Sequence, residues 1–439
     1  MVETVEFRVT WPTAPPPATG YPLLDDTLGR LKIKIGDTKV ATRYRTDNNN
    51  EGDELLLPTY ELAEWIVANW WPLPYEPRKR EDYLDDPDYR SRHWLGAARR
   101  GFALPNLWLC PAGDKIEITG SAAQLRFARL QFLDDVDETA IDTAIVCRAL
   151  RGFVERVLRR LEERGQHATP LHEAWRAICD TDPQAEEYCR LIGALGLSPY
   201  EDNPEIDADL DRVCGRLDRA LVEDLCQVAN EETFASLAER TVAIAATLDA
   251  APVADLGALL AAELPPDRHP DAWQWGNAAA RQVRRRLHIS DTDPAGGGQF
   301  LAALGLDTAS PLGIIPRPEE IKGGLRRQND DRMRVALFEE QRPQRRFTAA
   351  RAAFLAWAHG GPGDRLMTAA ITRPQQASRA FAAELLAPQA FIRTRAANRL
   401  LSDPAIQDIA QLLDAPAGAV KYQAQNAHIR VVASHGWGL

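Results

Sequence analysis

The sequence lacks the cysteine spacings and the long apolar run that would assign it quickly to a class. Its six cysteines show no Cys-x-x-Cys spacing, and five of them fall in segments with a helical pattern. We therefore expect reduced, buried thiols in place of disulfides or a zinc knot. The amino-terminal MVETVEFRVTW holds no apolar run long enough for a signal peptide or a membrane span. These absences predict a cytoplasmic protein with no membrane partner.

Positive charge is also in short supply. The 439 residues carry 52 lysines and arginines against 63 aspartates and glutamates, for a formal net charge of −11. As a whole, such a chain repels nucleic acid and anionic membranes unless a basic face is set apart. The basic helix pattern NAAARQVRRRLHI gathers Arg281, Arg284, Arg285 and Arg286. These side chains would suit either phosphate contacts or, as we favour, a solvated helix face.

The pattern along the chain divides it into three predicted domains. Alternating strand patterns and two candidate hairpins indicate a small α+β domain over residues 1–121. Apolar residues three and four apart predict a helical domain over 122–264, and the proline-rich LPPDRHP predicts a linker. Residues 271–439 form the third domain, in which PAGGGQF predicts a flexible loop. The fold class we predict is α+β, mainly helical.

Tryptophan is concentrated in the first predicted domain, which holds six of the eleven in the chain. Such residues can form a recognition surface for a base, a peptide or a protein, or they can fill the core of a small sheet. We favour the core for most of them. Trp70 and Trp71 are the exception, because adjacent helical positions cannot both face inward. We predict that this pair is partly exposed and forms a candidate interaction surface.

Two helical patterns occupy the stretch from Arg345 to Pro388. The first is RRFTAARAAFLAWAHG, whose many alanines predict close packing against neighbouring helices, and the second is QQASRAFAAELLAP. Farther on, residues 406–427 read IQDIAQLLDAPAGAVKYQAQNA, in which an apolar helix, a short Pro/Gly turn and a second helix follow one another.

Together these segments resemble the ImmA/IrrE family of zinc metallopeptidases. The family has a helix of the type RFTxAHExxH, then a helix of the type ExxANxFAxxLLxP and a helical tail. Residues 346–348, Ala350 and His359 match the first helix, and residues 381–386 with Pro388 match the second. The resemblance covers roughly residues 277–435, a little over a third of the chain. It implies a zincin-like module with a winged-helix-like tail.

The metal-binding positions of that family are not kept. In register, the His-Glu-x-x-His positions are Arg351, Ala352 and Leu355, and the third ligand falls at Gln375, or at Gln376 if the register slips by one. A guanidinium has no lone pair for zinc, and alanine can neither take nor deliver a proton. We expect no catalytic residue and no cofactor here. Arg351 is expected to pair with Asp364 or Glu384, or to hydrogen-bond with Gln375.

The resemblance therefore implies a non-catalytic pseudopeptidase acting as a protein-interaction, sensor or regulatory component. The family's associations point to bacterial stress response, mobile-element control or phage defence, with a protein partner such as a helix-turn-helix regulator or a defence-system component. The residues expected to bind a ligand in the former substrate cleft are Arg351, His359, Gln375, Gln376 and Glu384.

Two other functions stay open. A DNA-binding regulator would use the helices of residues 406–427, although Lys421 is the only base in the second of them. A metallopeptidase with non-standard ligands would need zinc on His359, with Asp364 or Glu384 and with His428 or His435.

Overall fold

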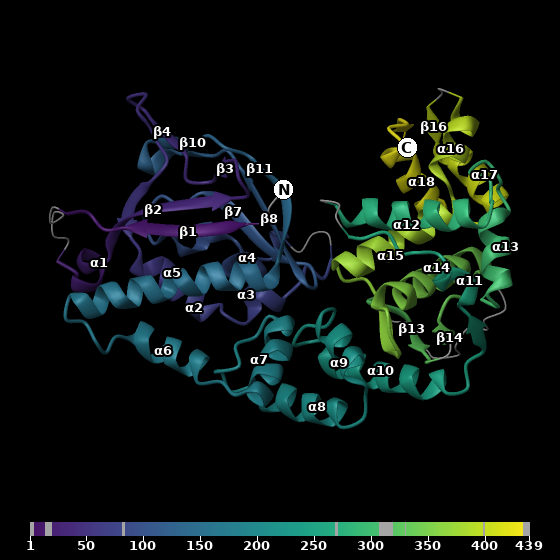
Figure 1. Ribbon diagram of the computed structural model, residues 1–439, viewed down its shortest axis with the longest axis horizontal. Helices are drawn as coiled ribbons and strands as arrows, with labels where there is room; N and C mark the ends of the chain where they lie inside the picture. Colours follow the sequence, from purple (N-terminus) through teal and green to yellow (C-terminus); the bar gives the residue numbers. More distant parts are fainter. Residues whose placement is uncertain are drawn as a thin grey trace, which may run out of the picture. The chain divides into compact units, whose positions relative to one another are not determined.

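A computed structural model describes most of the chain (Figure 1). The described residues are 4–13, 20–80, 84–267, 271–306, 319–329, 331–397 and 400–432. The fold is α+β with helices predominating, as predicted. The chain divides into two compact units, 1–202 and 203–439. The sequence suggested three domains, and the segment 122–264 is shared between the two units.

The first unit contains three small antiparallel sheets. Their strands are β1 (Val5–Thr10), β2 (Leu28–Ile35), β3 (Lys39–Val40) and β6 (Leu55–Pro58) in one; β4 (Tyr44–Thr46), β5 (Glu51–Gly52), β9 (Gln124–Leu125) and β10 (Leu130–Phe132) in another; and β7 (Asn106–Pro111), β8 (Lys115–Ser121) and β11 (Val136–Asp142) in the third. Along β1 every second side chain is buried, and Phe7 lies opposite Ile33 of β2. This alternation gives the sheet one face for the core.

Helices complete the first unit. They are α1 (Pro22–Asp26), α2 (Tyr60–Ala68), α3 (Pro72–Tyr75), α4 (Pro87–His93), α5 (Thr143–Glu163), α6 (Pro170–Cys179) and α7 (Pro183–Leu195), with short 3-10 turns at Leu95–Arg99 and Arg126–Ala128. Helix α5 buries a stripe from Val146 to Leu161 at three- and four-residue intervals and packs on β1 and α2. This packing places the first helix of the predicted second domain within the first unit.

The prediction that Trp70 and Trp71 are partly exposed is wrong. Their exposed fractions are 8% and 5%. Helix α2 ends at Ala68 and Trp71 caps the start of α3, so the two residues do not occupy adjacent positions of one helix. The change of chain direction lets both rings face inward: Trp70 packs edge-on against Trp175, and the Trp71 indole donates to Tyr200 Oη.

The second unit combines a four-stranded antiparallel sheet with many helices. In chain order its elements are α8 (Pro204–Cys214), α9 (Arg219–Cys226), α10 (Phe234–Leu248), β12 (Val253–Asp255), α11 (Gly257–Leu260), α12 (Ala272–Arg286), α13 (Gly296–Ala303), β13 (Ile321–Arg327), β14 (Arg332–Leu337), α14 (Arg342–His359), β15 (Gly363–Thr368), α15 (Arg373–Leu386), α16 (Gln389–Ala396), β16 (Leu401–Ser402), α17 (Asp403–Leu413), α18 (Ala417–Asn426) and β17 (Val431–Val432). The sheet order is β12-β14-β13-β15.

Helices α9 and α10 belong to this unit because they pack on its sheet. The fully buried Asp224 of α9 forms a bidentate ion pair with Arg365 of β15, with distances of 2.6 and 2.8 Å. The same carboxylate accepts from the backbone N–H of Leu366 at 2.8 Å. A buried carboxylate satisfied in this way holds the helix to the edge strand.

The prediction of a flexible loop at the glycine-rich PAGGGQF is wrong. This segment contains the start of helix α13. Its glycines are buried at close contacts: a Cβ on Gly297 would lie 2.3 Å from the Leu385 carbonyl oxygen, and one on Gly298 would overlap the Arg346 guanidinium. The glycines therefore permit close helix packing, which overrides their poor helix propensity.

None of the helices in the described part of the chain combines the length and the apolar character needed to cross a bilayer.

A buried carboxylate in the first unit, Glu76, is bonded to two basic side chains. Glu76 accepts from Arg92 at 2.7 and 2.8 Å, and its Oε2 lies 3.0 Å from His93 Nε2. The other ring nitrogen of His93 lies 2.8 Å from the carbonyl oxygen of Leu109. Burial alone would raise the pKa of Glu76, but the hydrogen bonds from His93 and Arg92 outweigh it and lower the pKa to about 2.

We predict that this carboxylate makes the fold sensitive to acid. Its pKa in the folded chain lies below the ordinary value of 4.5, so its stabilising effect is present above pH 4.5 and is lost as the pH falls toward 2. The loss is on the order of 3 kcal/mol. Urea unfolding of wild type and Glu76→Gln at several pH values tests this, because the variant lacks the carboxylate. Equal pH slopes would contradict the prediction, and the exposed Glu155→Gln serves as control.

Candidate functional site

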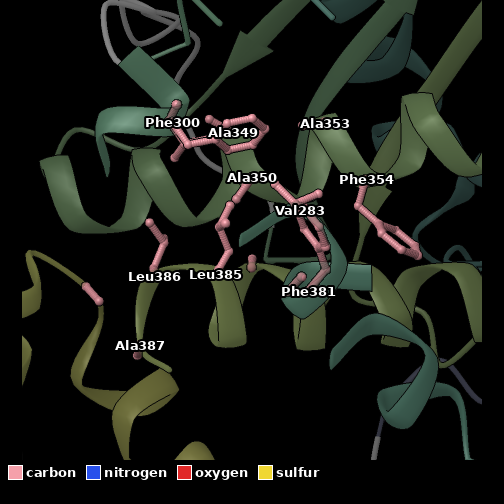
Figure 2. Close-up of a cluster of buried hydrophobic side chains, with 14 of the residues drawn as sticks. Val283, Phe300, Ala349, Ala350, Ala353, Phe354, Phe381, Leu385, Leu386 and Ala387 are labelled. Atoms are coloured by element: carbon pink, nitrogen blue, oxygen red, sulfur yellow. The ribbon is translucent and has the colours of Figure 1, made fainter. Parts of the chain in front are cut away.

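The candidate site lies where α14 and α15 pack together beside β15. The alanines predicted to pack closely, Ala349, Ala350, Ala352, Ala353 and Ala356, are all fully buried. Figure 2 shows several of them facing α15 from α14, with Phe381 and Leu385 on the other side. The ring centroids of Phe354 and Phe381 are 5.3 Å apart. Small residues on α14 thus bring the two helices close together.

Arg351 is buried between these helices and the end of β15. Its Nη2 donates to the Thr368 carbonyl oxygen at 2.7 Å and to Gln375 Oε1 at 2.8 Å. Its Nε donates to Ser378 Oγ at 3.2 Å. Of the expected partners, only Gln375 is in contact with it, because Asp364 pairs with Arg326 and Glu384 with Arg281.

Gln375 is itself held in a fixed orientation. Its Nε2 donates to the Leu366 carbonyl oxygen at 2.8 Å, and its Oε1 also accepts from the Thr368 N–H at 3.1 Å. Ser378 Oγ donates to the Gln375 carbonyl oxygen at 2.8 Å. These bonds identify the amide oxygen that faces Arg351 and join α14, α15 and β15 in one polar network.

The network is unusual because it contains a buried cation without a hydrogen-bonded carboxylate among the described residues. Desolvation and, secondarily, the positive charge of Arg379 lower the pKa of Arg351 to about 9, against an opposing attraction from Glu339. The group still carries its charge at neutral pH. Neutral oxygens of Thr368, Gln375 and Ser378 stabilise it.

The positions that the resemblance assigns to zinc ligands lie close together. Arg351 and Gln375 are in direct contact, and Leu355 is one turn along α14 from Arg351 and is also buried. Ala352 is fully buried and presents only a methyl group.

The five residues expected to line a cleft do not form one site. His359 is exposed at the end of α14, about 12 Å of helix rise beyond Arg351, where its Nδ1 lies 3.3 Å from Arg365 Nη1. Gln376 is half-buried, and its Nε2 has no hydrogen-bond acceptor among the described residues. Of the five residues, the structure brings only Arg351 and Gln375 into direct contact.

Glu384 belongs to a second network, about 13 Å of helix rise beyond Gln375. Its Oε1 accepts from Arg281 Nε at 2.8 Å, and its Oε2 accepts from Gln423 Nε2 at 2.5 Å. The backbone N–H of Gln389 also donates to Oε2, at 3.2 Å. This carboxylate connects α12, α15, α16 and α18, so the glutamate of the FAAELLAP pattern holds the helical tail in place.

No group of three or more His, Cys, Asp or Glu side chains with metal-binding geometry occurs in the described parts of the chain. The alternative zinc ligands are already engaged elsewhere, Asp364 with Arg326 and Glu384 with Arg281 and Gln423. His435 lies outside the described residues.

The predicted tail and basic helix are present, but the arginines are not one solvated face. Arg284 is fully buried and donates to the Leu385 carbonyl oxygen at 2.8 Å, and Arg281 is paired with Glu384. Only Arg285 and Arg286 of the four are exposed. Helices α17 and α18 follow each other through a short turn at Asp414, as predicted.

The sequence matches no known protein-family profile, no curated protein and no solved structure.

The residues that complete the Arg351 network, Thr368 and Ser378, were not identified from the sequence. Ser378 lies three residues after Gln375, the spacing at which two helical side chains are neighbours, and this was the available signal.

We predict that Arg351→Ala lowers the free energy of unfolding by about 3 kcal/mol, because it leaves a cavity and buried acceptors without donors. Urea unfolding measures the change. The matched control is Arg285→Ala, which removes an exposed arginine on α12 and should change stability by less than roughly 0.5 kcal/mol. Equal stabilities of the two variants would mean that the buried network does not stabilise the fold.

Proposed function

We propose that this chain is a non-catalytic pseudopeptidase of the ImmA/IrrE type that acts as a protein-interaction, sensor or regulatory component. One observation carries the proposal: Arg351 Nη2 lies 2.8 Å from Gln375 Oε1. The resemblance assigns these two positions to the first histidine and to the third ligand, a glutamate, of a zinc site. Residues 24 apart in the sequence thus meet where two ligands of one metal would have to meet.

The chemistry at these positions supports the lack of catalysis. A charged guanidinium has five N–H donors and no lone pair, so it repels a metal cation instead of binding it. The position of the general base is Ala352, which cannot accept a proton from water. The Arg351 network instead stabilises the packed helices, and the unit is a scaffold for contacts made elsewhere on its surface.

The partner we propose is a protein, such as a helix-turn-helix regulator or a defence-system component. Among the arginines of the basic helix, Arg284 is buried and Arg281 is paired with Glu384, and α18 carries only one lysine. Binding to nucleic acid needs more phosphate neutralisation than these side chains supply.

A gel shift at low ionic strength tests the DNA-binding alternative, and salt-sensitive binding lost in Lys421→Gln would favour it.

Restoring the four ligand and base positions tests the proposal. We predict that a variant with Arg351→His, Ala352→Glu, Leu355→His and Gln375→Glu binds one zinc ion per chain, measured by metal analysis after dialysis. The matched control keeps Leu355 and carries the other three changes, so it lacks one ligand and should bind zinc at least tenfold more weakly.

A folded quadruple variant that binds no zinc would show that the register or the family assignment is wrong. Wild-type protein that holds stoichiometric zinc, and loses it on His359→Ala, would instead favour a metallopeptidase with non-standard ligands.

A further inference from the structure

Helix α6 begins at a capping box in which the side chain at the third helical position is a histidine. The backbone N–H of Thr169 donates to His172 Nδ1 at 3.4 Å, and Thr169 Oγ1 lies 2.8 Å from the same nitrogen. The Thr169 side chain in turn accepts from the backbone N–H of His172. Glutamate or glutamine usually occupies this position of the box, because the side chain must accept a hydrogen bond. A histidine can replace them only while Nδ1 carries no proton.

These contacts assign one form of the imidazole. A backbone N–H can only donate, so Nδ1 is an acceptor and the neutral ring carries its proton on Nε2. That Nε2 is buried and has no hydrogen-bond partner among the described residues, since Glu162 Oε1 lies 3.8 Å away. His172 as a whole is 9% exposed. A charged ring would therefore lose most of its hydration in this position.

The surroundings of the ring oppose its protonation. Burial has the largest effect, and His167 and Arg176 act in the same direction. Glu162 of α5 favours the charged ring, but the net effect lowers the pKa of His172 below the ordinary 6.5. Tyr60 of α2, beside the cap, stays neutral because burial raises its pKa. The ring also lies in the first turn of α6, where the helix dipole disfavours a cation.

We propose that the Thr169–His172 pair is a pH-sensitive cap, which holds the start of α6 while the imidazole is neutral and releases it when the imidazole is protonated. Protonation by solvent places an N–H on Nδ1, opposite the N–H of Thr169, so the acceptor of the capping bond becomes a second donor. Loss of a cap weakens a helix by a factor of about five to ten. This pair lies in the first unit and does not depend on the pseudopeptidase assignment.

Release of α6 changes an apolar surface of the first unit. Helix α6 packs on α2, and Trp175 of α6 lies edge-on to Trp70 with ring centroids 5.0 Å apart. The guanidinium of Arg151, on α5, lies 5.3 Å from the centroid of the Trp175 ring. An opened α6 would take Trp175 out of this contact and uncover Trp70, which is only 8% exposed while the helix is in place. Acidification should therefore expose an apolar patch of the kind that binds other proteins.

Hydrogen exchange of the α6 amides in the full chain, at about pH 7.5 and about pH 5 and corrected for the intrinsic exchange rate, tests the proposal. Because the pKa of His172 is lower in the folded chain than its ordinary 6.5, the cap has its full effect above pH 6.5 and weakens as the pH falls below that value. We expect the protection of α6 to fall by a factor of about five to ten in wild type. His172→Gln keeps an acceptor at the same position but does not titrate, so its protection should be equal at the two pH values.

His167→Gln is the matched control, because it removes an exposed histidine near the cap and leaves the capping pair unchanged. It should keep the wild-type response. Titration of the His172 ring by NMR is a second measurement that needs no variant, and the Thr169 amide signal should shift with the same pKa, below 6.5. Protection of α6 that does not change with pH in wild type, an equal change in His172→Gln, or a ring pKa at or above 6.5 would each overturn the proposal.

Discussion

Burial of the Arg351 guanidinium among neutral oxygens constrains the centre of the second unit. A cation in this position needs acceptors from several directions, and they come from the end of β15, from Gln375 and from Ser378 on α15. Because Gln375 also bonds to Leu366 and Thr368 of β15, moving either helix would break bonds on both sides. The arginine thereby fixes how α14 and α15 pack on the sheet. The small alanine side chains of α14 are buried in the same packing.

Other arginines of this unit also connect separate secondary-structure elements. Arg346 of α14 reaches Asp414 in the turn between α17 and α18, and Arg373 of α15 pairs with Asp267. Arg284 joins α12 to the end of α15 through the Leu385 carbonyl oxygen. The planar guanidinium group has several N–H donors, so one arginine side chain can bond to two elements at once. The glycines of α13 serve the same purpose, since Gly298 leaves room for Arg346.

The sequence predicted the elements of this unit better than it predicted their contacts. The helices of the 345–388 stretch and of the tail, and the burial of the alanines, follow from local periodicity, and the structure confirms them. Gln375, which contacts Arg351, was one of the three partners expected for this arginine. Periodicity does not tell which residues on a helix reach the same place, and in the structure His359 and Glu384 contact residues other than Arg351. The prediction for Trp70 and Trp71 was wrong for a related reason. Helix α2 ends at Ala68, before both residues, so helical spacing no longer applies to them.

The identity of the residue at position 351 has a physical explanation in these contacts. The Thr368 carbonyl oxygen is buried at the end of its strand, and the Gln375 oxygen is held toward the same point by bonds on its other side. An apolar residue at position 351 would leave these acceptors without one of their donors, and a lysine would offer a single ammonium for oxygens on different elements. A guanidinium reaches Thr368, Gln375 and Ser378 together. The same feature that stabilises the packing makes the position unable to bind a metal cation.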